Sequence, residues 1–222
     1  ETERRLLGKY GVQAIEIEAA RPEQIIPHVR NAHAVCVISA SLPAAVIDSL
    51  DACRLISRLG NGTDKIDVAR ATERGIVVAN VPDFCTDEME DHVMAMVLSF
   101  ARQIPRMARH MRAGAFAQAR SESLALRRLS SRKLGLIGWG ASAHAVARRA
   151  LSFGMQVIAT RRQLQRPSPE AKALGIDIVD LDKLLEDADS VSLHLPLTAQ
   201  TRGLLSRERL AHMRQGAYFI NA

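Results

Sequence analysis

Short apolar runs alternate with polar, helix-like stretches along the first 85 residues. We interpret the apolar runs as strands and the stretches between them as helices. Strands and helices that alternate at this spacing predict a parallel sheet covered by helices on both faces. The predicted strands span residues 13–17, 34–38, 54–59 and 76–79, and the predicted helices residues 22–29, 43–50 and 66–72, with Asp64 as the cap of the last helix.

The alternation breaks at Pro82, and a long helix is predicted over residues 88–107. Its composition is apolar enough for burial along much of its length, and its acidic start suits the positive end of a helix dipole. A polar connection over residues 112–133, partly helical, follows it. The helix start carries Thr86, Glu88, Glu90 and Asp91.

A second alternation of apolar runs and helix-like stretches starts at Leu134. The sequence therefore predicts an α/β protein with two parallel-sheet units of the Rossmann-like or flavodoxin-like kind, residues 1–85 and residues 86–222. The strands predicted in the second unit span residues 134–137, 156–159, 176–179, 190–194 and 218–221.

Charge and composition exclude several classes of function. The net charge is +6, but only 4% of the residues are aromatic and no stacking platform for bases is visible, so we expect no nucleic-acid partner. No uninterrupted run of about 18 apolar residues predicts a membrane span. Three widely spaced cysteines in apolar surroundings indicate reduced core thiols in a cytoplasmic protein and no metal site. They are Cys36, Cys53 and Cys85.

A glycine-containing turn follows the first strand of the second unit. Gly138 would allow a tight turn and Gly140 a close approach of a pyrophosphate to the backbone, while Ala143 stands where a dinucleotide fingerprint often has a third glycine. The amides of Ala141 and Ser142 would then face the phosphates. The alternative is a plain strand-to-helix connection, but the position inside a βαβ-sized unit favours a dinucleotide site.

Two arginines end the second strand of this unit, where an acidic residue would accept hydrogen bonds from the ribose hydroxyls of NAD. Arg161 and Arg162 offer no such acceptor, but their guanidinium groups can pair with the 2′-phosphate of NADP. The pattern predicts NADP in preference to NAD. The alternative is a pair of solvated arginines at a strand end.

Four stretches of the chain resemble the D-isomer-specific 2-hydroxyacid dehydrogenases, and glyoxylate and hydroxypyruvate reductases in particular. They are "RLGNGTDKIDVARATERGIVVANVPDF", "TDEMEDHVMAMVLSFAR", "KLGLIGWGASAHAVARRALSFGM" and "DSVSLHLPLTAQTRGLLSRERLAHMRQGAYFINA". Their order along the chain is that of the family. The resemblance implies that residues 1–85 are part of a substrate domain and residues 86–222 part of a dinucleotide-binding Rossmann domain.

The resemblance also implies roles for individual residues. The loop around Asn61 and Gly62 is expected to offer backbone amides to a substrate carboxylate, with Asn61 also near the cofactor; a plain turn is the alternative. His194 is expected to be a structural histidine at a strand end and not a proton donor. Family positions that contact the cofactor fall on Leu195, Pro196, Thr201 and Ala222.

No catalytic residue is assigned within these 222 residues. In the family, the arginine that binds the substrate follows the position of Ala222, and a carboxylate and a histidine come later. The family's opening strand would precede Glu1. We therefore expect the sequence to be part of a longer polypeptide, and residues 1–222 alone not to reduce 2-oxo acids with NADPH.

The function implied by the resemblance is hydride transfer between NADPH and a small 2-oxo or 2-hydroxy acid, bound in a cleft between the two units. A homodimer is expected through the long helix and the connection after it. The alternative is a non-catalytic, dinucleotide-sensing corepressor on the same scaffold. The residues at the family's catalytic positions after Ala222 would distinguish the two.

Overall fold

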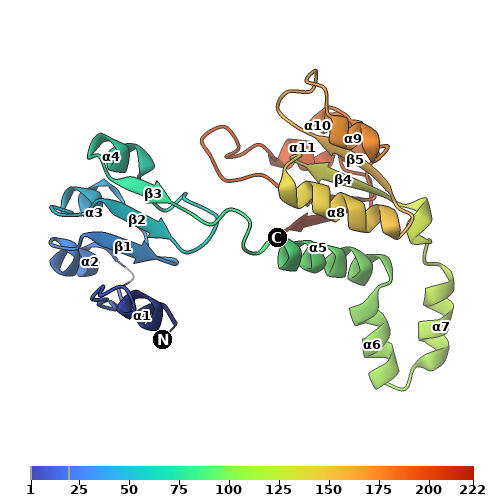
Figure 1. The fold of residues 1–222 in the computed structure, drawn as a ribbon. Helices are drawn as coiled ribbons and strands as arrows, with labels where there is room; N and C mark the ends of the chain where they lie inside the picture. Colours follow the sequence, from blue (N-terminus) through green and yellow to red (C-terminus); the bar gives the residue numbers. More distant parts are fainter. Residues whose placement is uncertain (1, 20) are drawn as a thin grey trace. The chain divides into compact units, whose positions relative to one another are not determined.

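The computed structural model describes residues 2–19 and 21–222, which form two compact α/β units with parallel sheets (Figure 1). The first unit ends at Phe84 and the second begins at Cys85. In the described residues, no helix is both long enough and apolar enough to span a bilayer. The α/β fold class with parallel sheets is confirmed.

The first unit contains a three-stranded parallel sheet in the order β1-β2-β3. Its strands are β1 (Ala34–Val37), β2 (Leu55–Arg58) and β3 (Val77–Ala79). Three helices share one apolar core with the sheet: α2 (Pro22–Val29), α3 (Ala44–Asp48) and α4 (Val68–Glu73). This core includes Ile25, Val46, Ile47, Ile56 and Ala71, and α1 (Thr2–Gly8) precedes these elements in the chain.

The strand predicted over residues 13–17 is wrong. This segment has no regular secondary structure, although the side chain of Ile17 packs against the core of the first unit. A strand needs a neighbour for its backbone hydrogen bonds, and in the described residues β1 pairs only with β2. The apolar alternation of residues 13–17 therefore reflects contact with the core and not membership of the sheet.

Two further predictions for this unit are corrected. The side chain of Asp67, and not that of Asp64, accepts a hydrogen bond from the amide of Arg70 and caps α4, which starts two residues later than predicted. The sheet is also covered on one face only within the described chain. Ile38 and Val77 on the other face are 65% and 62% exposed, because α2, α3 and α4 pack together on the same side.

The second unit is built on a five-stranded parallel sheet in the order β6-β5-β4-β7-β8. Apolar residues of α5 and α8 form a core with β4 and β5, and a separate cluster joins β4, β5 and β7 to α10, so the sheet is packed with side chains on both faces. The strands are β4 (Lys133–Ile137), β5 (Gln156–Thr160), β6 (Asp177–Ile178), β7 (Ser190–Leu193) and β8 (Tyr218–Asn221). The helices are α5 (Thr86–Ala101), α8 (Ala141–Ser152), α9 (Pro169–Ala173), α10 (Leu181–Asp187) and α11 (Arg207–Ala211).

The strand order reverses between β4 and β7. The chain runs outward from β4 through β5 to β6 and then returns to place β7 on the other side of β4. In such sheets, ligands bind outside the carboxyl ends of the strands at the point of reversal. The register pairs Ile137 with Thr160 and with Leu193, so the segments after these three strands start side by side.

The long helix predicted over residues 88–107 is two helices. α5 ends at Ala101, Gln103 adopts a left-handed conformation with φ of 50°, and α6 (Ile104–Arg112) begins there. Pro105 explains the break, because proline cannot donate the helical hydrogen bond and its ring would collide with the carbonyl one turn earlier. The connection predicted to be partly helical contains α7 (Phe116–Leu124) and a short 3-10 helix (Leu129–Ser131), and α6 and α7 form a hairpin (Figure 1).

An ion-pair cluster joins α5 to α8. Glu90 is fully buried and pairs with Arg149, which also donates to Asp91 at 3.0 Å. Burial of a carboxylate is tolerated only with such a partner. The acidic residues near the start of α5 therefore do more than suit its dipole, because two of them hold the glycine-turn helix α8 against α5.

Candidate functional site

The predicted glycine turn lies at the point where the strand order reverses. Gly138 has a φ of 104°, and its amide donates to the carbonyl of Thr160 at 3.0 Å. A Cβ atom at this position would collide with the carbonyl oxygen of His194 and contact Leu195. The turn is therefore enclosed between the ends of β5 and β7, and only glycine fits its first position.

The second glycine starts α8. Gly140 is the N-cap, with φ of −119°, and no atom lies within 4 Å of where its Cβ would be. The first amides of a helix have no partner within the helix, so those of Ala141 and Ser142 are directed beyond its start. Ala143, at the position of the third glycine, is fully buried, and its small side chain lets α8 pack closely on the sheet. Unpaired amides at an open helix start are the geometry with which proteins bind anions.

His194 supports the turn from the end of β7. Its amide donates to the carbonyl of Ile137 at 2.8 Å, and its Nδ1 lies 3.2 Å from the hydroxyl of Ser142. Burial lowers the pKa of His194 to about 4, because the charged imidazolium would lose its hydration. A neutral imidazole at physiological pH fits the structural role predicted for this histidine.

This burial makes the stability of the second unit sensitive to acid. The pKa of His194 is about 4 in the folded state against an ordinary value near 6.5, so unfolding takes up a proton between these two pH values. Stability contributed by the neutral imidazole is complete above pH 6.5 and is lost progressively as the pH falls to 4, by about 3 kcal/mol at most. Urea unfolding at pH 7 and pH 4.5 measures this loss.

His194→Gln is the matched variant, since glutamine cannot titrate in this range. We expect its free energy of unfolding to fall less between pH 7 and pH 4.5 than that of the unmodified protein. A His194 imidazole that titrates near pH 6.5 in NMR spectra of the folded protein would contradict the prediction.

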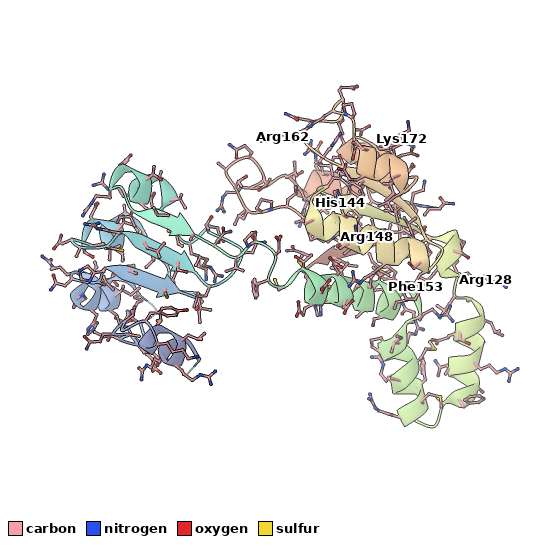
Figure 2. The ribbon with its side chains drawn as sticks, in the orientation of Figure 1. Arg128, His144, Arg148, Phe153, Arg162 and Lys172 are labelled. Carbon is pink, nitrogen blue, oxygen red and sulfur yellow. The ribbon has the colours of Figure 1, made fainter. Side chains whose placement is uncertain are left out.

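Arg161 follows β5 immediately beside the glycine turn. Two of its guanidinium nitrogens, Nε and Nη2, are buried and have no hydrogen-bond partner within residues 2–19 and 21–222. Glu170 makes no hydrogen bond to Arg161 within the described residues. The positive charge of Arg161 acts on it only through space, as one of the causes that lower the pKa of the Glu170 carboxyl. Arg162 is exposed and labelled in Figure 2. Buried guanidinium nitrogens without an acceptor are costly, and an anion would supply the acceptors.

The loop after β7 carries three of the predicted cofactor contacts. Leu195 borders Gly138, while the hydroxyl of Thr201 donates to the carbonyl of Pro196 at 2.6 Å and accepts from the amide of Thr198 at 2.8 Å. The hydroxyl of Thr201 thus stabilises its own loop. The fourth predicted contact, Ala222, follows β8, whose Asn221 pairs with Leu193 in the register of the sheet.

The predicted substrate loop belongs to the first unit. Two backbone carbonyls of this loop accept hydrogen bonds from side chains. The carbonyl of Asn61 accepts one from the side-chain amide of Asn80 at 2.8 Å, and the carbonyl of Gly62 accepts one from the Nε of Arg58 at 3.0 Å. Among the described residues, the amides of Asn61 and Gly62 have no acceptor. Two adjacent free amides beside an arginine can bind a carboxylate.

Several contacts at the site were not predicted from the sequence. Trp139, between the two glycines, donates its indole N–H to the hydroxyl of Ser168 at 3.0 Å, and its ring contacts that of His144 with centroids 4.3 Å apart. His144 and Arg148 lie one turn apart on α8 (Figure 2). A lone tryptophan inside a glycine turn is a signal that could have drawn attention to this position. Within the part of the chain that the structure describes, no group of three potential metal ligands occurs.

Comparison with known proteins finds relatives over most of the chain. Residues 94–222 match the model of the NAD binding domain of D-isomer specific 2-hydroxyacid dehydrogenases. The chain is 36% identical to a hydroxypyruvate reductase of Thermotoga maritima over 89% of this chain and 61% of that protein. It is 32% identical to a D-3-phosphoglycerate dehydrogenase of Methanocaldococcus jannaschii over 93% of this chain and 39% of that one.

A solved structure of D-lactate dehydrogenase from Aquifex aeolicus, in complex with NAD and lactic acid, aligns with a TM-score of 0.82 and 27% identity. The alignment covers 88% of this chain and 58% of that one. The chain thus spans about 40 to 60% of the length of these three relatives.

Proposed function

Because the chain belongs to the D-isomer specific 2-hydroxyacid dehydrogenases, we propose that its protein transfers hydride between a nicotinamide dinucleotide and a small 2-oxo or 2-hydroxy acid. The observation that carries the proposal is the glycine turn at the reversal of the strand order. Gly138 is enclosed by the ends of β5 and β7, and Gly140 opens α8 with its backbone accessible. This is the place and the shape that a pyrophosphate requires.

The preferred dinucleotide is NADP. Arg161 presents buried guanidinium nitrogens without a partner, and Arg162 adds an exposed positive charge next to it. A 2′-phosphate would supply the missing acceptors, whereas the ribose hydroxyl of NAD would have no carboxylate at the end of β5 to bind it. The site therefore fits the phosphorylated cofactor better.

Each group of residues has a defined task in this proposal. The amides of Ala141 and Ser142 bind the pyrophosphate. The segments after β7 and β8, with Leu195, Pro196, Thr201 and Ala222, border the nicotinamide half, and the free amides of Asn61 and Gly62 bind the substrate carboxylate. When bound, the nicotinamide supplies or accepts the hydride.

We also place the protein in the cytoplasm and expect it to be a homodimer that uses the α6–α7 hairpin. Within the described residues, this hairpin leaves apolar side chains uncovered, since Ile104, Met111 and Phe116 are all more than half exposed. α6 contains no buried residue at all. A partner subunit would cover such a surface.

The direct test uses the complete polypeptide. Titration with NADPH and NADH should give a smaller Kd for NADPH, and oxidation of NADPH should follow addition of glyoxylate, hydroxypyruvate or pyruvate. Tight NADPH binding without turnover of any 2-oxo acid would favour a non-catalytic dinucleotide sensor. Equal dissociation constants for the two cofactors at moderate salt would contradict the proposed preference.

A further inference from the structure

Two consecutive residues of the glycine turn hold the two ends of the segment that carries Arg161 and Arg162. The amide of Gly138 donates to the carbonyl of Thr160, directly before the arginines. The indole N–H of Trp139 donates to the hydroxyl of Ser168, at the far end of the same segment. The loop between β5 and α9 is therefore closed at both ends by the phosphate-binding turn.

The hydroxyl of Ser168 has all its hydrogen-bonding capacity in use. It accepts from the indole of Trp139 at 3.0 Å and from the amide of Ala171 at 3.3 Å, and it donates to a carboxylate oxygen of Glu170 at 3.3 Å. A serine has one donor and two acceptor positions, so this arrangement is saturated. The indole itself is fixed by the ring of His144 on α8.

We propose that Trp139 is a positioning residue that selects for the 2′-phosphate of the adenosine ribose by holding the arginine loop through Ser168. This proposal rests on the proposed NADP preference. Without the indole hydrogen bond, Ser168 still caps α9, but the far end of the loop loses its tie to the glycine turn. Ordering the arginines on a phosphate then costs more conformational entropy at the moment of binding. The pyrophosphate contacts come from backbone amides of α8 and do not depend on this bond.

The test compares two nucleotides that differ by one phosphate, adenosine 2′,5′-bisphosphate and adenosine 5′-monophosphate. Trp139→Phe keeps an aromatic ring against His144 but removes the N–H donor. We expect the Kd for the bisphosphate to rise about three- to tenfold, as for the loss of one hydrogen bond, while the Kd for the monophosphate stays within about twofold. Ser168→Ala should also raise the Kd for the bisphosphate. Ser168→Thr keeps a hydroxyl, so its Kd for the bisphosphate should stay close to that of the unmodified protein.

Two controls separate positioning from general damage. Ser152→Ala removes a serine hydroxyl from the exposed end of α8 and should change neither affinity. Trp139 is the protein's single tryptophan, so its emission spectrum should shift in Ser168→Ala and remain unchanged in Ser152→Ala. Equal weakening of both nucleotides by Trp139→Phe, or no weakening of either, would overturn the proposal.

Failure of the NADP preference would be recognised separately. If the unmodified protein binds both nucleotides equally well, the proposed NADP preference is wrong. Hydrogen–deuterium exchange of the ligand-free protein then tests separately whether Trp139 holds the loop. Amides of residues 161–168 should exchange faster in Trp139→Phe than in the unmodified protein. Unchanged exchange would show that the indole does not hold the loop.

Discussion

Replacing Arg161 with aspartate should weaken NADPH binding by ten- to a hundredfold and strengthen NADH binding. The change removes a guanidinium whose Nε and Nη2 are buried without a partner, and with it about 1.5 to 3 kcal/mol of charge-assisted hydrogen bonding to the 2′-phosphate. The new carboxylate would repel that phosphate and accept hydrogen bonds from the unphosphorylated ribose. Titration of both proteins with both cofactors measures the switch.

Arg148→Asp is the control, because it makes the same change in net charge at an exposed position on α8 (Figure 2). Arg148 lies seven residues, or about 10 Å along the helix axis, beyond the start of α8. Charges are screened over about 8 Å at physiological ionic strength, so the effect on either cofactor should be small. If Arg148→Asp reduces NADPH binding as much as Arg161→Asp, the preference arises from overall charge. If neither variant does so, Arg161 has no phosphate to bind.

The second large effect concerns folding. Gly138→Ala should destabilise the second unit by about 2 to 5 kcal/mol, because an L-residue is strained at a φ of 104° and the added Cβ collides with the carbonyl of His194. The backbone that carries this carbonyl is held by the hydrogen bond from the His194 amide to the carbonyl of Ile137, which opposes its displacement. Urea unfolding followed by the fluorescence of Trp139 gives the change in free energy.

Gly140→Ala separates folding from binding within the same turn. No atom lies within 4 Å of the added Cβ, and a φ of −119° suits any L-residue, so the free energy of unfolding should change by less than about 1 kcal/mol. Cofactor affinity should nevertheless fall at least tenfold, since the methyl group occupies the side from which the pyrophosphate approaches. Normal binding by Gly140→Ala would mean that the phosphates lie elsewhere.

Sequence patterns predicted most of the parallel sheets because apolar runs reflect burial between layers. The strand predicted over residues 218–221 has the observed bounds of β8, and the turn after Ile137 lies where its glycines indicated. Residues 13–17 failed because an apolar pattern also arises where a segment only touches the core. The break after Ala101 was predictable in principle, since Pro105 stood within the last turn of the predicted helix.

Contacts between distant residues could not be predicted in this way. Trp139 and Ser168 are 29 residues apart, and their hydrogen bond exists only because α9 returns to the turn. The pairing of Glu90 with Arg149 likewise depends on how α5 and α8 pack. The sequence placed Glu90 only at the positive end of a helix dipole, whereas the packing of α5 on α8 buries it beside Arg149.

The strand order also bears on how such a protein can evolve. β5, which leads to the arginines, and β8, which in the proposed function leads toward the nicotinamide half, are separated by β4 and β7, a distance of roughly 14 Å at the usual spacing of strands. We therefore expect substitutions in the loop after β5 to leave the backbone after β8, and the nicotinamide half proposed to lie there, unchanged. Under the proposed function, a lineage could change its preference between NADPH and NADH by a few substitutions in this loop and keep its reaction with the 2-oxo acid.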